Sequence, residues 1–128
     1  MTELDYPQVN GVAPGNGYSH VVTGIGQWVA ISGQVALDAN GQFVGRDDPA
    51  AQAEQVFANL TRCLTAADAT FENVVKLTYF VTDMYYLPEI RIVRDKYIPG
   101  PKPASSAVQV ASLFSPLALL EIEAFAIV

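Results

Sequence analysis

The sequence reads PAAQAEQVFANLTRCLTAA over residues 49–67 and VVKLTYFVT over residues 74–82. In the first run, apolar residues recur at spacings of three and four, which predicts an amphipathic helix. Asp47 or Asp48 can cap this helix, and Pro49 suits its first turn. The second run alternates with a period of two, which predicts a strand with one apolar face. The centre of the chain is therefore expected to be a helix followed by a strand.

The cysteine at position 63 is the single thiol of the chain, which excludes an intramolecular disulfide framework. Cys63 falls on the apolar stripe of the predicted helix. A buried structural thiol is favoured there over a reactive nucleophile. We therefore expect Cys63 to contribute to packing rather than to catalysis.

The part of the chain that precedes the helix carries two β-prone runs. Residues 1–17 are rich in Gly, Pro and Asn and are expected to form an extended lead-in. The runs at residues 18–24 and 28–35 are joined through Gly-Ile-Gly, which predicts a β-hairpin. Asn40-Gly41 is a strong signal for a tight turn. Two strands and a turn are therefore expected before the helix.

The part of the chain that follows the central strand repeats the same types of element. A second helix is predicted over residues 88–98, where Pro-Gly-Pro ends it, and two more strands are predicted over residues 104–111 and 119–128. The order is β-β-α-β-α-β-β. It predicts an α/β fold of the α+β kind, in which two helices pack on one face of a mixed sheet.

The composition indicates that this sheet is shared between copies of the chain. A chain of 128 residues has room for one domain, residues 1–128, with one core. It is 51% hydrophobic and only 16% charged, which is apolar for so small a domain. The second face of the sheet must be covered, and no predicted element remains to cover it. We therefore expect a homo-oligomer with an apolar interface.

The charge balance and the ends of the sequence narrow the classes of partner. The formal net charge is −6, which disfavours binding to nucleic acid on electrostatic grounds. The N-terminus lacks the basic and apolar regions of a signal peptide, and no apolar run is long enough for a membrane span. The expected compartment is the cytoplasm. One histidine and one cysteine make no recognisable ligand set, so neither a metal nor another cofactor is expected.

Several stretches resemble one known family when they are taken in order. They are Gly17–His20, Ile31–Gln34, Gln52–Leu60, Asn73–Asp83, Pro103–Val110 and Leu120–Ala124. Together they resemble the YjgF/RidA family, and the match runs from about Tyr18 to the C-terminus. The resemblance implies the chorismate-mutase-like fold, in which three subunits pack their sheets into a central barrel. It also implies a homotrimer that holds a small-molecule ligand at each subunit interface.

The resemblance implies a chemistry and a set of residues for it. Active members of the family hydrolyse reactive enamines and imines to 2-oxo acids and ammonia. Glu121 matches the family's cleft glutamate, Tyr18 matches the tyrosine that lines the pocket, and Ser32 and Gly33 match the backbone segment beside the ligand. Strand alternation places Glu121 on one face with Glu123 and apolar residues. A carboxylate there is expected to be functional, the alternative being a structural group bound to backbone or to a neighbouring subunit.

The sequence departs from the family's pattern at the substrate-binding arginine. Deaminating members read Pro-Ala-Arg-Ser, whereas this chain has Ser105 at the arginine position. Losing a bidentate contact to a carboxylate costs on the order of 2–4 kcal/mol. Arg91 aligns with the asparagine that closes the cleft, and Arg94 follows one turn later. Arg91 is a candidate substitute, the alternative being a solvated helix face or an intersubunit salt bridge with Glu123 or Asp95.

Three functions are compatible with these residues to different degrees. The favoured one is a deaminase of imines or enamines whose specificity is altered because Ser105 replaces the arginine. The alternative is a trimer that binds a small metabolite without catalysis. Endoribonuclease activity, which is attached to some relatives, is poorly supported by an acidic chain with one histidine. That residue, His20, is expected to be structural or exposed, although its spacing from Tyr18 also allows it to reach the rim of the cleft.

Overall fold

The computed structural model describes residues 3–128 and contains one four-stranded mixed sheet with two helices. The strands are β1 (Trp28–Gln34), β2 (Val74–Val81), β3 (Ala104–Gln109) and β4 (Leu120–Ile127). The helices are α1 (Pro49–Ala66) and α2 (Leu87–Tyr97), with short 3₁₀ turns η1 (Phe71–Asn73) and η2 (Met84–Tyr86). The expected mixed sheet with two helices is confirmed, and the bounds differ from the predicted ones by one or two residues.

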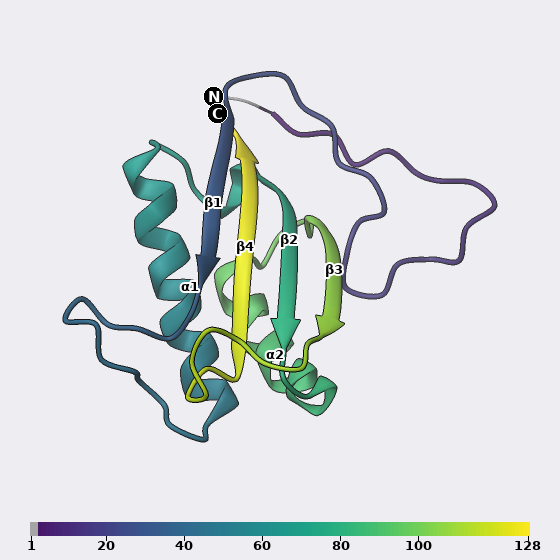
Figure 1. Cartoon of the computed structure of the whole chain (residues 1–128). Helices are drawn as coiled ribbons and strands as arrows, with labels where there is room; N and C mark the ends of the chain where they lie inside the picture. Colours follow the sequence, from purple (N-terminus) through teal and green to yellow (C-terminus); the bar gives the residue numbers. More distant parts are fainter. Residues whose placement is uncertain (1–2) are drawn as a thin grey trace.

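The strands lie in the order β1-β4-β2-β3, so the C-terminal strand is central. β4 runs antiparallel to β1 and β2, whereas β2 and β3 are parallel and α2 connects them. Both helices lie on the same face of the sheet (Figure 1). β3 forms one edge and β1 forms the other.

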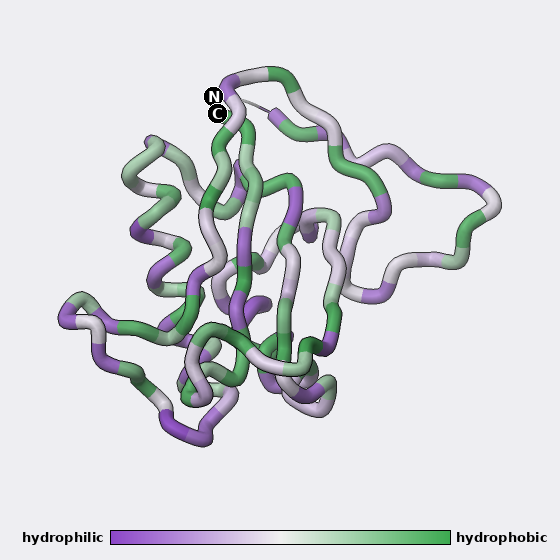
Figure 2. Tube along the Cα trace, in the orientation of Figure 1, coloured by the Kyte–Doolittle hydropathy of each residue, from purple (hydrophilic) through white to green (hydrophobic). Residues whose placement is uncertain are grey.

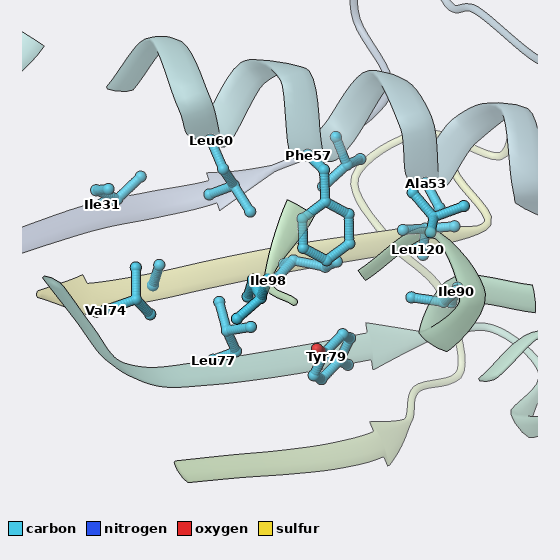
Figure 3. Close-up of a cluster of buried hydrophobic side chains, with 14 of the residues drawn as sticks. Ile31, Ala53, Phe57, Leu60, Val74, Leu77, Tyr79, Ile90, Ile98 and Leu120 are labelled. Carbon is cyan, nitrogen blue, oxygen red and sulfur yellow. The ribbon is translucent and has the colours of Figure 1, made fainter. Parts of the chain in front are cut away.

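The core lies between the helices and this face of the sheet (Figure 3). Alternate residues of β2 and β4 are buried there, and they meet one apolar stripe from each helix. The largest fully buried apolar side chains are Phe57, Leu60, Leu64, Leu77, Ile90, Leu120 and Ile122. Two helices over one face thus bury enough apolar surface to order the sheet.

Helix α1 begins where the sequence predicts it. The Asp48 carboxylate accepts a hydrogen bond from the Ala51 backbone N–H at 3.1 Å, and Pro49 is the first helical residue. Asp48, not Asp47, is therefore the cap. The Cys63 thiol packs against the core but is only half-buried.

The predicted hairpin of residues 18–24 and 28–35 is wrong in its first strand. Residues 18–24 make single β-bridges instead: the Ser19 N–H donates to the Pro103 carbonyl at 3.2 Å, and Thr23 pairs with Asp5. Since these backbone groups bond to other segments, they do not pair with β1. The segment crosses the free edge of β3 (Figure 1). It thereby brings Tyr18 to that edge.

The second face of the sheet carries no helix. Along β4, buried residues alternate with half-buried ones that point to this face, and Figure 2 shows the alternation of hydropathy. Trp28 stacks on Phe125 there, with ring centroids 5.2 Å apart, yet Trp28 remains 60% exposed. A large aromatic surface of this kind is typical of an interface.

Candidate functional site

The residues predicted for the site fall into two groups that lie apart in the chain's fold. Ser32, Gly33 and Glu121 lie together on β1 and β4, and we call them the acidic half-site. The second group lies at the β3 edge and lines one small cavity. Besides Asn16, its lining includes five polar residues that we call the basic half-site: Tyr18, Tyr79, Arg91, Arg94 and Ser105.

In the acidic half-site, the side chain of Glu121 lies directly over the backbone of Gly33. A Cβ atom built on Gly33 would come within 2.0 Å of Glu121 Oε2 and 2.6 Å of its Cδ. The carboxylate is half-buried and makes no hydrogen bond or ion pair to any residue among 3–128. Its oxygens are therefore available to a ligand, and a glycine at position 33 is needed to leave them in place.

This contact predicts a clean separation of activity from stability. Gly33→Ala is expected to displace the Glu121 side chain, because its Cβ would overlap the carboxylate, and to lower activity by at least about 10-fold. The flexible glutamate can rotate away, so the melting temperature is expected to change little. Gly100→Ala is the matched control, since a Cβ there meets no atom within 4 Å. Unchanged activity in Gly33→Ala would contradict this geometry.

The basic half-site surrounds a cavity of about 20 Å³. β2 and β3 supply Tyr79 and Ser105 from the face that carries the helices, and α2 supplies Arg91 and Arg94. Tyr18 closes the cavity from the N-terminal segment that crosses the edge of β3. A polar space of this size holds about one water-sized group.

Arg94 is the buried cation of this half-site, with a side chain only 8% exposed. Its Nε–H donates to Asp95 Oδ1 at 3.0 Å, and its Nη2 forms an ion pair with the same oxygen at 2.9 Å. Slight burial opposes the ionisation of Asp95, but Arg94 and Lys102 hold the pKa of its carboxyl below the usual range. Arg91, by contrast, is exposed and makes no ion pair with a described residue. Within one chain, Asp95 pairs with Arg94 and Lys102.

The hydroxyl of Tyr79 is buried and has no hydrogen-bond partner among the described residues. Burial raises the pKa of Tyr79 to about 12, and the charges of nearby Arg94 and Arg91 partly oppose this shift. A buried hydroxyl without a partner costs about 1–3 kcal/mol. The sequence predicts only that Tyr79 lies on the apolar face of a strand, because a tyrosine in an alternating run is typical of a core position.

The raised pKa of Tyr79 predicts a loss of stability at high pH. The unfolded chain ionises this phenol near pH 10 and the folded chain only near pH 12, so the folded state binds more protons between these values. Stability is then complete below about pH 10 and falls by about 2–3 kcal/mol as pH rises to about 12. Thermal melts of wild type and Tyr79→Phe test this. Equal pH dependence in the two proteins would contradict it.

One chain does not bring the two half-sites together. Glu121 points to the face without helices, whereas Ser105 lies in register with buried Leu77 on the helix face. The whole width of β2 separates β4 from β3. A single site that uses both groups therefore requires the β1–β4 part of one subunit and the β3 edge of another.

Other features of the described chain lie outside these half-sites. The His20 Nε2 atom lies 2.6 Å from the Ala13 carbonyl oxygen, and its ring packs edge-on to Tyr18, which fits a structural role. A cavity of about 340 Å³ between Tyr6, Phe71 and Tyr97 contains none of the predicted residues. Within residues 3–128, no three His, Cys, Asp or Glu side chains are grouped to hold a metal ion, and no helix is long and apolar enough to cross a membrane.

Comparison with known protein sequences gives relatives over most of the chain. Residues 9–128 match the family model described as Endoribonuclease L-PSP. The mouse 2-iminobutanoate/2-iminopropanoate deaminase is 38% identical over 75% of this chain and 70% of its own. Protein DfrA of Myxococcus xanthus is 36% identical over 69% of this chain and 67% of its own.

Comparison with solved structures agrees with the sequence matches. A protein of the conserved Rid family from Yersinia pestis, YyfB, is 35% identical with a TM-score of 0.90, over 98% of this chain and 99% of its own. RidA from an Antarctic Psychrobacter is 32% identical with a TM-score of 0.74, over 97% and 99%. The family model and these two solved structures cover nearly the whole chain, half-sites included. The chain therefore belongs to the Endoribonuclease L-PSP family, which is also the YjgF/RidA family.

Proposed function

We propose that this protein is a cytoplasmic homotrimer that hydrolyses reactive imines or enamines of small amino acids. The acidic half-site of one subunit faces the basic half-site of the next, so each boundary holds one ligand. The products are a 2-oxo acid and ammonia. The names of the mouse and rat relatives, both 2-iminobutanoate/2-iminopropanoate deaminases, support this choice of reaction.

The single observation that carries the proposal is the state of Glu121. Its carboxylate is half-buried over Gly33 and has no partner among the described residues of its own chain. A carboxylate in that position is suited to accept a hydrogen bond or a proton from a ligand or a water molecule. The cations of the basic half-site provide the opposite charge that a carboxylate substrate needs.

The reaction needs one acid–base group and one cation. Glu121 accepts a proton from a water molecule as the water oxygen attacks the carbon of the protonated C=N bond, which gives a neutral tetrahedral carbinolamine. The Glu121 carboxyl then donates this proton to the nitrogen. The C–N bond breaks as ammonia leaves, the hydroxyl of the former carbinolamine gives its proton to Glu121 to form the C=O of the 2-oxo acid, and this proton passes to ammonia or to solvent. Tyr18 and the Ser32–Gly33 backbone line the space around the reacting carbon.

The replacement of arginine by Ser105 is the basis for proposing altered specificity. A serine hydroxyl forms one neutral hydrogen bond, whereas a guanidinium provides a charge and two parallel donors. The cavity that Ser105 lines is instead supplied with cations from α2. A substrate carboxylate bound from that side is placed differently, which changes which imines fit.

The proposal is tested by following freshly generated 2-iminopropanoate and 2-iminobutanoate with and without the protein. We expect micromolar protein to accelerate the loss of at least one of them and to release ammonia in equal amount. The larger imines of aromatic and branched amino acids should be included, because the altered anchor changes the fit. No acceleration over buffer for any of them would overturn the enzymatic proposal.

The alternative is a trimer that binds a metabolite without catalysis, which the loss of the family's arginine at position 105 favours. In that case 2-oxo acids or related ligands would raise the melting temperature, since binding to the native state stabilises it. Stabilisation without any imine hydrolysis would select the binder. Endoribonuclease activity is disfavoured by the net charge of −6.

A further inference from the structure

We infer that Arg94 and Tyr79 form the carboxylate-binding subsite of this protein, in place of the arginine that Ser105 replaces. The inference rests on the proposed function for the identity of the ligand as a small 2-imino or 2-oxo acid. It rests on the structure for the position of the subsite. Arg91, the substitute that the sequence suggests, then lies at the exposed mouth of the cavity rather than at its base.

The guanidinium of Arg94 has donors left for a ligand. An arginine side chain carries five N–H donors, and the Nε–H of Arg94 donates to Asp95 Oδ1, which also lies 2.9 Å from Nη2 as an ion pair. No described residue lies in hydrogen-bonding geometry to the Nη donors. The guanidinium is almost fully buried and lies against the lining of the cavity. Its Nη donors are therefore available to an acceptor on a ligand that enters this cavity.

The hydroxyl of Tyr79, which lies near this guanidinium, points to the same requirement. The residue is 3% exposed, lines the cavity and has no partner for its hydroxyl within residues 3–128. Figure 3 shows its ring among the buried side chains along β2. A phenylalanine would fill that core position without an unsatisfied group. The hydroxyl therefore has a use that packing does not explain.

The size and the walls of the cavity select a carboxylate end rather than a whole ligand. About 20 Å³ accepts one small polar group, and the remainder of the ligand must extend toward the subunit boundary. Gly17 lies beside the guanidinium with a φ of +81°, and a Cβ there would lie 3.2 Å from Arg94 Nη2. The close approach of this backbone keeps the guanidinium fixed, as a pre-organised anion site needs.

Titration calorimetry with 2-oxobutanoate tests the inference on the purified full-length protein. Arg94→Met and Tyr79→Phe are the test variants, and Arg62→Met on the exposed side of α1 is the matched control for loss of an arginine. We expect Arg94→Met to weaken binding by about 10- to 100-fold, Tyr79→Phe by about 5-fold or more, and Arg62→Met not at all. Lys102 still pairs with Asp95 at 3.3 Å when Arg94 is lost, which favours folding of the variant.

Each variant tests the subsite on its own. If one of them fails to fold, the binding affinity of the other still decides whether the subsite exists. Tyr79→Phe is expected to melt at a temperature equal to or above that of wild type without ligand, because it removes an unpaired buried hydroxyl, and yet to bind more weakly. Wild-type affinity in both variants, or no binding of 2-oxobutanoate by wild type, would overturn the inference. If wild type binds 2-oxobutanoate through Arg94 but hydrolyses no imine, the subsite is supported and the proposed enzymatic function is rejected. If imine hydrolysis is the same in wild type and in both variants, the enzymatic function is supported and the subsite is rejected.

Discussion

Glu121→Gln is expected to lower kcat for small 2-imino acids by about 100-fold or more, because the amide neither accepts nor returns a proton. The amide has nearly the shape of the carboxylate and still fits over Gly33, so the fold is expected to remain intact. Steady-state kinetics on freshly generated 2-iminopropanoate or 2-iminobutanoate measures the effect. Affinity for 2-oxobutanoate should change far less than kcat.

Glu123→Gln is the control that the strand itself provides. Glu123 lies two residues away on β4, points to the same face and pairs in register with Thr78 of β2. The Glu123→Gln substitution removes one negative charge from the same face but leaves the contact between Glu121 and Gly33 unchanged. The kcat of this variant is therefore expected to stay within about 3-fold of wild type. A similar loss in both variants would mean that the charge of this face matters and that Glu121 is not an acid–base group.

Ser105→Arg is expected to lower activity, although it restores the residue that deaminating relatives carry. The new guanidinium would enter a cavity of about 20 Å³ that Arg94 and Arg91 already line. Overpacking costs about 1–3 kcal/mol, and like charges add to this cost. The KM for a small 2-imino acid should rise by about 10-fold or more.

Ser105→Ala completes this comparison. It removes one neutral hydroxyl and leaves the cavity open, so its KM is expected to change by no more than about 3-fold. Steady-state kinetics on all three proteins gives the answer. A Ser105→Arg variant with a lower KM than wild type would show that the position at 105 is still the natural anchor. This result would contradict the proposal that Arg94 binds the substrate carboxylate.

The elements of the fold could be predicted because local patterns and tertiary packing agree in them. The period of α1, its Asp48 cap and the alternation of β2 and β4 all point to the same structure. The prediction of a strand at residues 18–24 was wrong. The residues of this run are β-prone, but its backbone forms hydrogen bonds with Pro103 and Asp5 instead of pairing with β1. Such partners lie far away in the sequence and leave no local signal.

The candidate site was predictable in part, and the reason differs between the half-sites. Gly33 and Glu121 follow from the family resemblance, and the structure places them in contact. The sequence alone did not identify Arg94 and Tyr79 as site residues. Arg94 has the pattern of a charged helix residue beside Asp95, and Tyr79 has the pattern of a buried strand residue. Only the packing of α2 over the edge of β3 brings them to one cavity.

In the proposed trimer, each site is built from two subunits. Glu121→Gln and Arg94→Met subunits, each of low activity alone, should therefore complement each other in mixed trimers. With equal amounts, half of the subunits offer an intact carboxylate and half an intact guanidinium, so about a quarter of the boundaries carry both. The most direct measurement is the imine-hydrolysis rate of trimers co-assembled from differently tagged chains. Sites shared between subunits should give about a quarter of wild-type activity, and activity no higher than that of the two parent variants would contradict them.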